Sequence, residues 1–137
     1  MRSIVMMPLA AAVLAACTQT PAETAASTRA AAVTQEALTK ELAGLVPGKP
    51  QACVDQFRSQ QVKAYGASIV YQVTGGLKYR SDTAGGCERV GRGDILVTRS
   101  YSGRLCRGDI GQTIDPVSRF PTGSCSFADF VPYRKAS

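Results

Sequence analysis

The sequence contains no histidine and no tryptophan among its 137 residues. The lack of histidine is the more informative absence, because imidazole is the usual general base of serine and cysteine hydrolases. Histidine is also a common zinc ligand, and it is the side chain that most often responds to pH near neutrality. The sequence therefore excludes Ser-His-Asp and Cys-His catalysis, histidine-ligated zinc enzymes and histidine-based pH switches.

Long apolar runs are missing as well. The apolar run at residues 4–14 contains Pro8, and it is shorter than the roughly 20 residues that a membrane-spanning helix needs. The run follows the positive charge of Arg2 and precedes small residues, which is the three-part pattern of a bacterial export signal. We therefore expect residues 1–16 to be a signal peptide.

The residues that end this segment point to a lipid anchor. Leu14-Ala15-Ala16-Cys17 resembles the lipobox of bacterial lipoproteins. The resemblance implies that the Cys17 thiol carries a diacylglyceryl group and that the chain is cut before Cys17 and acylated there. Two or more acyl chains anchor a protein stably to a membrane. Thr18 stands where an aspartate retains such lipoproteins at the inner membrane, so we expect the periplasmic face of the outer membrane.

The remaining chain divides into a tether and one domain. Residues 17–33 have almost no large apolar side chain, so we expect the lipidated Cys17 to lead into a flexible tether. Residues 34–135 are expected to form a single globular domain. Lys and Arg total 16 against 10 for Asp and Glu, which favours solubility and allows attraction to an anionic glycolipid or other envelope surface. Nucleic acid fits this charge but conflicts with export.

Five cysteines provide the covalent constraints. Cys17 belongs to the lipobox, which leaves Cys53, Cys87, Cys106 and Cys125. An even number in a small exported domain predicts two disulfides, and four cysteines allow three pairings. We favour Cys53–Cys106, because both lie in strand-like apolar stretches, and Cys87–Cys125, because both lie in glycine-containing loops. No pair has the C-x-x-C spacing of a redox site, and a site of four thiolates around zinc is disfavoured, so we expect no metal and no cofactor.

The apolar pattern predicts a mainly β domain, α+β at most, with one N-terminal helix. Thr34 can cap a helix that begins at Gln35, and Gly44 and Pro47 end it. The apolar stripe of this helix consists of Leu38, Leu42 and Leu45. The strands that follow are expected to form a small antiparallel sheet or a half-open barrel.

One hairpin can be placed by its register. A three-residue loop at Thr74-Gly75-Gly76 pairs Val73 with Leu77 and Tyr71 with Tyr79, which puts the apolar side chains on one face. Residues 94–99 contain three consecutive apolar residues and are expected to form a central strand.

The C-terminal part is predicted in less detail. A strand over residues 104–115 is expected to kink near Gly108, and residues 119–123 are expected to form a turn. A helical turn is predicted at residues 126–129, and Pro132 is expected to mark an edge strand.

Four arginines form the strongest candidate binding patch. They surround one predicted hairpin and the turn after it, and they could bind phosphate or carboxylate groups. The alternative is a solvated basic rim that pairs with nearby aspartates. The four are Arg99, Arg104, Arg107 and Arg119.

Carboxylates offer a weaker candidate site. A pair of them could support acid–base catalysis, but each also fits a role in a turn, strand end or cap, and their spacing selects no pair. The four are Asp94, Asp109, Asp115 and Asp129. We assign no catalytic residue. The adhesion tripeptide Arg107-Gly108-Asp109 lies in a predicted strand beside Cys106 and is discounted.

Several segments together resemble a family of small proteobacterial envelope lipoproteins of unknown function. The resemblance covers most of residues 42–135 and implies a single disulfide-bonded β-rich domain behind a lipobox, with no catalytic residue carried over. The segments are Gly48-Lys49-Pro50, residues 94–99, Leu105-Cys106, Ser118-Arg119-Phe120 and Phe130-Val131-Pro132-Tyr133.

The sequence therefore favours a non-catalytic binding or structural module of the envelope. Its expected partners are the membrane, through the lipid on Cys17, and an envelope protein or anionic glycolipid. One alternative is an Asp-dependent envelope hydrolase, which the missing histidine and the lack of a motif disfavour. Another is a lysozyme-inhibitor-like protein, which charge repulsion disfavours because lysozymes are usually cationic too.

Overall fold

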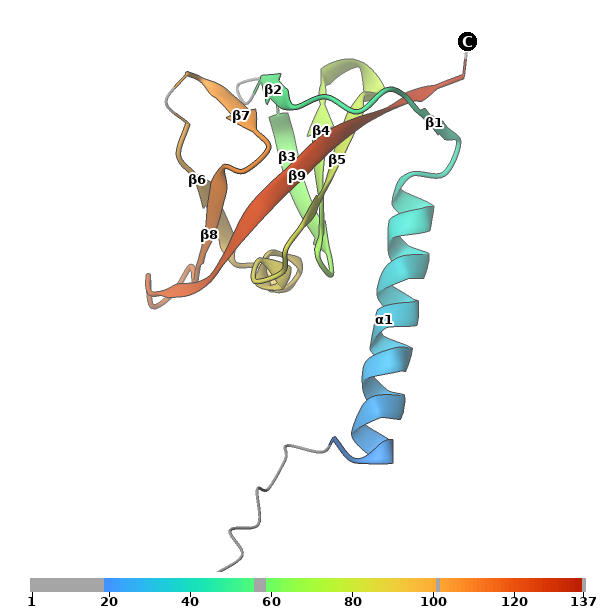
Figure 1. The fold of residues 1–137 in the computed structure, drawn as a ribbon, viewed down its shortest axis with the longest axis vertical. Helices are drawn as coiled ribbons and strands as arrows, with labels where there is room; N and C mark the ends of the chain where they lie inside the picture. The colour runs from blue at the N-terminus through green and yellow to red at the C-terminus, as the bar shows by residue number, and fades with distance from the viewer. Residues whose placement is uncertain (1–18, 56–58, 101, 137) are drawn as a thin grey trace, which may run out of the picture.

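The computed structural model describes residues 19–55, 59–100 and 102–136. The predicted signal peptide and Cys17 lie outside the described residues. A seven-stranded antiparallel sheet has the order β3-β4-β5-β9-β8-β6, with β1 added beside β9, and β2 and β7 form a separate pair (Figure 1). The strands are β1 (Leu45–Pro47), β2 (Cys53–Asp55), β3 (Ser59–Tyr65), β4 (Ser68–Val73), β5 (Lys78–Thr83), β6 (Ile95–Thr98), β7 (Arg104–Cys106), β8 (Ile110–Ile114) and β9 (Pro121–Lys135).

The long strand β9 is shared by both halves of the sheet. Its first part pairs with β8, from Pro121 to Ser126, and its second part pairs with β5, from Phe127 to Tyr133. The sheet curls around this strand, which confirms a mainly β half-barrel with one helix and two disulfides. The helical turn predicted at residues 126–129 is wrong, because buried Phe127 and Phe130 face the core from an extended strand with a bulge between them.

Two other predictions about the C-terminal part need correction. Pro132 does not mark an edge, because β9 lies between β5 and β1 there and the Pro132 carbonyl accepts a hydrogen bond from the Gly48 amide at 2.7 Å. The turn expected at residues 119–123 lies earlier: Asp115 and Phe120 close it through a backbone hydrogen bond of 3.0 Å, and β9 begins at Pro121.

The β4–β5 hairpin has the predicted register. Tyr71 is opposite Tyr79, and the Val73 amide donates to the Leu77 carbonyl at 2.8 Å across the short 3-10 turn Thr74–Gly76. Gly75 has a φ of 78°, a left-handed conformation that glycine adopts without steric cost. The apolar face of the hairpin therefore determined its register.

The segment at residues 94–99 is not a central strand. It forms β6, which lies at the end of the sheet and pairs with β8 alone in the sheet order. A run of apolar residues does not separate a strand buried on both faces from an edge strand with an exposed apolar face. The strand predicted over residues 104–115 is divided into β7 and β8 by a turn at Gly108, where φ is 87°.

The helix begins well before the predicted start. Helix α1 spans Pro21–Glu41, and Thr20 caps it: the Glu23 amide donates to the Thr20 hydroxyl, and the Thr20 amide donates to the Glu23 carboxylate. The predicted start after Thr34 is therefore wrong. Residues 21–33, expected to belong to the tether, are helical and exposed, because this capping box, Pro21 in the first turn and a high alanine content favour a helix without a core face.

The C-terminal end of α1 is fastened to the sheet by one carboxylate. Glu41, whose side chain is 10% exposed, accepts hydrogen bonds from Lys63 (3.0 Å), Tyr65 (2.6 Å), Gln72 (2.6 Å) and Lys78 (2.5 Å). Burial opposes ionisation, but these bonds outweigh it and lower the pKa of Glu41 to about 2. Burial and the same carboxylate raise the pKa of the Tyr65 hydroxyl. One ionised group thus joins α1 to β3, β4 and β5.

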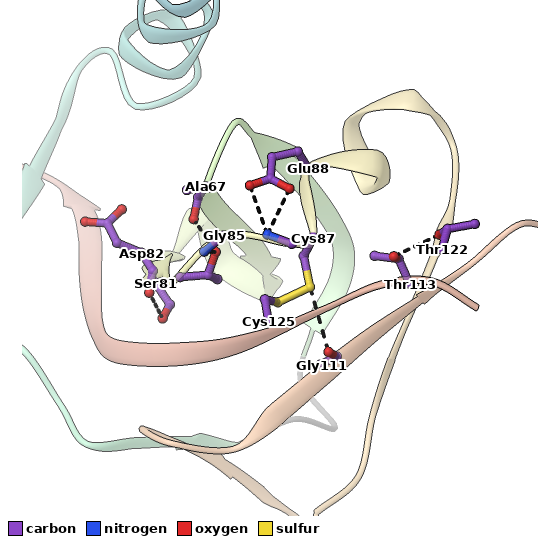
Figure 2. The surroundings of a disulfide bond; sticks show 12 residues. Ala67, Ser81, Asp82, Gly85, Cys87, Glu88, Gly111, Thr113, Thr122 and Cys125 are labelled. Carbon is purple, nitrogen blue, oxygen red and sulfur yellow. Dashed lines mark hydrogen bonds between the residues drawn. A yellow bond between two sulfur atoms is a disulfide. The ribbon is translucent and has the colours of Figure 1, made fainter. Parts of the chain in front are cut away.

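Both disulfides have the predicted pairing. Cys53–Cys106 joins the facing residues of β2 and β7, and Cys87–Cys125 joins β9 to the loop after β5 (Figure 2). Cys87 and Cys125 lie in the core. The other members of this core are Val54, Ile69, Tyr71, Leu105, Phe127 and Phe130.

The backbone next to the buried disulfide approaches β9 closely. A Cβ atom on Gly86 would lie 2.1 Å from the Ser124 carbonyl oxygen, and one on Gly123 would lie 2.0 Å from the Gly86 carbonyl oxygen. No side chain fits at either position, so two glycines and the Cys87–Cys125 bond fix this crossing.

We expect Glu41→Gln to lower the free energy of unfolding by about 2 kcal/mol at neutral pH. The folded-state pKa of Glu41 is depressed, so its stabilisation is complete above about pH 4.5 and is lost as the pH falls towards about 2. Urea unfolding followed by circular dichroism should show the gap between wild type and variant closing over that range.

The matched control is Glu36→Gln, which removes an exposed ion pair of 2.8 Å with Lys40 on the same helix. Such pairs contribute about 0.5 kcal/mol or less. If the difference in free energy of unfolding between wild type and Glu41→Gln did not change with pH, the ionised Glu41 carboxylate would not be the source of the stabilisation.

We also expect the two disulfides to differ in their resistance to reductant. Their sequence separations of 53 and 38 residues imply similar chain-entropy contributions, about 4 kcal/mol each. Access differs, because Cys87 and Cys125 are 1% and 4% exposed while Cys53 and Cys106 are half-buried. Mild thiol reductant under native conditions should open Cys53–Cys106 first, as alkylation and mass spectrometry would detect. In urea, where both disulfides are accessible, they should be reduced at similar rates. Equal rates of reduction in the native protein would contradict the prediction.

Candidate functional site

The candidate catalytic aspartates all have structural partners. Asp109 accepts a hydrogen bond from the Cys106 amide at 2.8 Å, and Asp115 accepts one from the Ser118 amide at 2.7 Å. The carboxylate of Asp129 pairs with the Arg107 guanidinium at 3.1 Å. These bonds close turns and pair charges, so each carboxylate has the structural role that the sequence favoured.

Asp94 is the most buried member of this group, with a side chain that is 5% exposed. The Thr122 hydroxyl donates to it, and the Arg89 guanidinium lies 2.9 Å away. These two contacts hold the pKa of Asp94 below its usual value. Thr122 also hydrogen-bonds to the Thr113 hydroxyl at 2.9 Å (Figure 2). The network joins the start of β6 to β8 and β9, which is a structural function.

The remaining acidic side chains are also engaged. Each acidic residue in the described part of the chain takes part in a hydrogen bond, an ion pair or another electrostatic interaction. Glu88, for example, accepts a hydrogen bond from the Gly86 amide at 2.9 Å, and Asp82 pairs with Arg80 at 2.9 Å. Glu23, Glu36 and Glu41 have the partners given with helix α1, and Asp55 also has an interaction.

The predicted arginine patch is divided by the structure. Arg119 lies in the turn after β8, whereas Arg99 follows the end of β6 that pairs with the beginning of β8. Arg107 is neutralised by Asp129, and the Arg104 guanidinium lies 3.5 Å from the Cys53 carbonyl oxygen. Arg99 lines a hollow beside Val97 and Ile110.

The adhesion tripeptide lies in the turn between β7 and β8, not in a strand as predicted. The Gly108 amide donates to the Phe127 carbonyl at 2.8 Å, and the Asp109 amide donates to the Cys106 carbonyl at 3.0 Å. The Arg107 and Asp109 side chains have the internal partners described above. The tripeptide is thus part of the fold.

The outer face of β6 and β8 carries exposed apolar side chains. Ile95, Val97 and Ile110 are 47%, 37% and 56% exposed, while the alternate residues Leu96 and Thr113 face the core. A hollow of about 350 Å³ lies on this face. Its lining residues are Val97, Arg99, Gly108, Asp109, Ile110, Gln112 and Ser124. We call this surface the β6–β8 face.

A second hollow lies beside β1 at the C-terminal end of β9. It has a volume of about 500 Å³, and three exposed cations line it: Lys49, Arg134 and Lys135. We call it the basic groove. Sequence reasoning missed it, because only the adjacency of Arg134 and Lys135 is visible in the sequence, and Lys49 is brought to them by strand pairing.

Other classes of site find no support in the described residues. No group of three or more His, Cys, Asp or Glu side chains there could hold a metal ion. None of the helices in the described part of the chain is long and apolar enough to cross a bilayer. No family model, curated protein or solved structure matches the chain.

Proposed function

We propose that the protein is a lipid-anchored lipoprotein on the periplasmic face of the outer membrane and that its domain is a non-catalytic binding module. Leu14-Ala15-Ala16-Cys17 and the following Thr18 support the anchor. Helix α1 begins at Pro21, close behind Cys17, so it joins the lipid to the domain as an arm.

Binding is favoured over catalysis by the state of the acidic side chains. A carboxylate that acts as general acid or base must reach substrate within hydrogen-bond distance. The four candidate aspartates accept hydrogen bonds from backbone amides in turns or pair with arginine side chains. The sequence has no histidine that could act in their place. An Asp-dependent hydrolase therefore has no support from the site.

The β6–β8 face is the surface that carries the proposal. It combines exposed Val97 and Ile110 with Arg99, which makes no ion pair within the described residues, and β6 lies at the end of the sheet. An edge strand offers main-chain groups to an added strand, and flanking side chains select its sequence. The partner that fits is an extended segment of an envelope protein with apolar side chains for Val97 and Ile110 and a carboxylate for Arg99.

The anchor predicts two changes in cells. The wild-type chain should incorporate a palmitate analogue, and Cys17→Ser should abolish labelling and remove the protein from the outer-membrane fraction. Thr18→Asp should keep the label but move the protein to the inner-membrane fraction, which serves as the control for lipid attachment. A Cys17→Ser chain that still incorporates the analogue would contradict the assignment.

If the β6–β8 face is the binding site, photo-crosslinking to the partner should depend on where the reactive group is placed. A photo-reactive benzoylphenylalanine at Ile110 should give a discrete crosslink in living cells, while the same group at Val33, which is 68% exposed on α1, should not. Arg99→Glu should reduce the Ile110 crosslink by about tenfold, because a single charge contact with a carboxylate contributes about 1–2 kcal/mol. Equal crosslinking at Ile110 and Val33, or no effect of Arg99→Glu, would reject this face as the binding site.

A further inference from the structure

The cations of the basic groove are not paired with acidic side chains within residues 19–55, 59–100 and 102–136. In the described part of the chain no acidic side chain lines this groove, and Lys49, Arg134 and Lys135 form no ion pair there. Lys63 and Lys78, by contrast, are bound to Glu41. Arg134 also borders a neighbouring hollow with Asp55, a residue that has an interaction of its own.

Strand pairing builds the groove. Leu45 is opposite Lys135 and Val46 is opposite Arg134. After β1 the chain continues beside β9, and the Gly48 amide donates to the Pro132 carbonyl at 2.7 Å. This contact places Lys49 near Arg134 and Lys135. Apolar groups complete the lining, among them Val46, Pro47 and Pro132. The groove thus offers three positive charges beside a small apolar surface.

The groove lies far from the proposed anchor. Helix α1 begins at one end of the long axis of the molecule, and the C-terminus lies at the other end (Figure 1). A 21-residue helix is about 30 Å long. Charges in physiological salt are screened over about 8 Å. With the arm extended, the headgroups of the anchoring leaflet therefore lie beyond the electrostatic reach of the groove.

We propose that the basic groove binds the carboxylate-bearing peptide stems of peptidoglycan, the anionic polymer that faces such a domain from the side away from its membrane. The proposal rests on the envelope location given under the proposed function. Arg134 can bind a carboxylate through two parallel hydrogen bonds, while Lys49 and Lys135 act as point charges. The exposed side chains of Val46 and Pro47 contact the aliphatic parts of a stem. Each contact is weak, and the repeated stems of the polymer supply many of them.

The test uses the full lipidated chain, purified in a non-ionic detergent and pelleted with isolated sacculi. The groove variant combines Lys49→Gln, Arg134→Gln and Lys135→Gln. The control variant combines Arg29→Gln, Arg92→Gln and Arg119→Gln, which are exposed cations outside the groove and give the same change in net charge. Circular dichroism verifies that all three proteins are folded.

Wild type should bind sacculi at low salt and be released at high salt. The groove variant should bind roughly a hundredfold more weakly, because each Lys or Arg near an anionic surface contributes about fivefold, and the control variant should stay within about threefold of wild type. Lys49→Glu alone, at a position outside any strand, reverses one charge and should weaken binding roughly 25-fold.

Three outcomes would overturn the proposal. These are no binding of sacculi, an equal loss in the control variant, and groove-dependent binding of anionic phospholipid vesicles in place of sacculi. Palmitate labelling distinguishes a failure of the groove proposal from a failure of the anchor proposal. If cells do not lipidate the chain but it still binds sacculi through the groove, the groove proposal holds and the anchor proposal is rejected.

Discussion

The fold depends on the crossing at which the loop before Cys87 meets β9. Gly86 and Gly123 let the two backbones approach to a separation that no side chain permits, and the Cys87–Cys125 bond holds them there. Because β9 pairs with β8 in one half of the sheet and with β5 in the other, this crossing determines how the two halves curl around the core. The β6–β8 face and the basic groove lie along the two ends of the same strand, so a single strand positions both candidate surfaces.

Glu41 has a similar role for the helix. Residues 21–33 of α1 bury no side chain. The orientation of the helix relative to the sheet therefore depends on its last turns, where Leu38 is buried and Glu41 binds Lys63 and Lys78. Capping keeps the first turns helical and the Glu41 carboxylate keeps the last turns docked. The proposed lipid and the proposed binding surfaces are therefore separated by a defined length of helix.

Features set by local periodicity could be predicted from the sequence. The β4–β5 register followed from keeping Tyr71 and Tyr79 on one face. Both disulfide pairings were predicted correctly, but the reason given for Cys87–Cys125 was wrong, because Cys125 lies in strand β9 and not in a loop. The start of α1 could not be found from an apolar stripe, because capping and alanine propensity alone sustain residues 21–33. The exposure of β6 depends on its place in the sheet order. Lys49 and Arg134 meet only through the pairing of β1 with β9, and no local pattern encodes that contact.

The engaged carboxylates have a consequence for how the surface responds to its surroundings. Burial alone would favour the neutral forms of Glu41 and Asp94, but their partners hold both ionised. With no histidine in the chain, few side chains titrate between about pH 5 and 9. The net positive charge is therefore nearly constant across that interval, while its range in space shortens as salt rises. Changes in ionic strength therefore alter the reach of these charges more than changes in pH within that interval do.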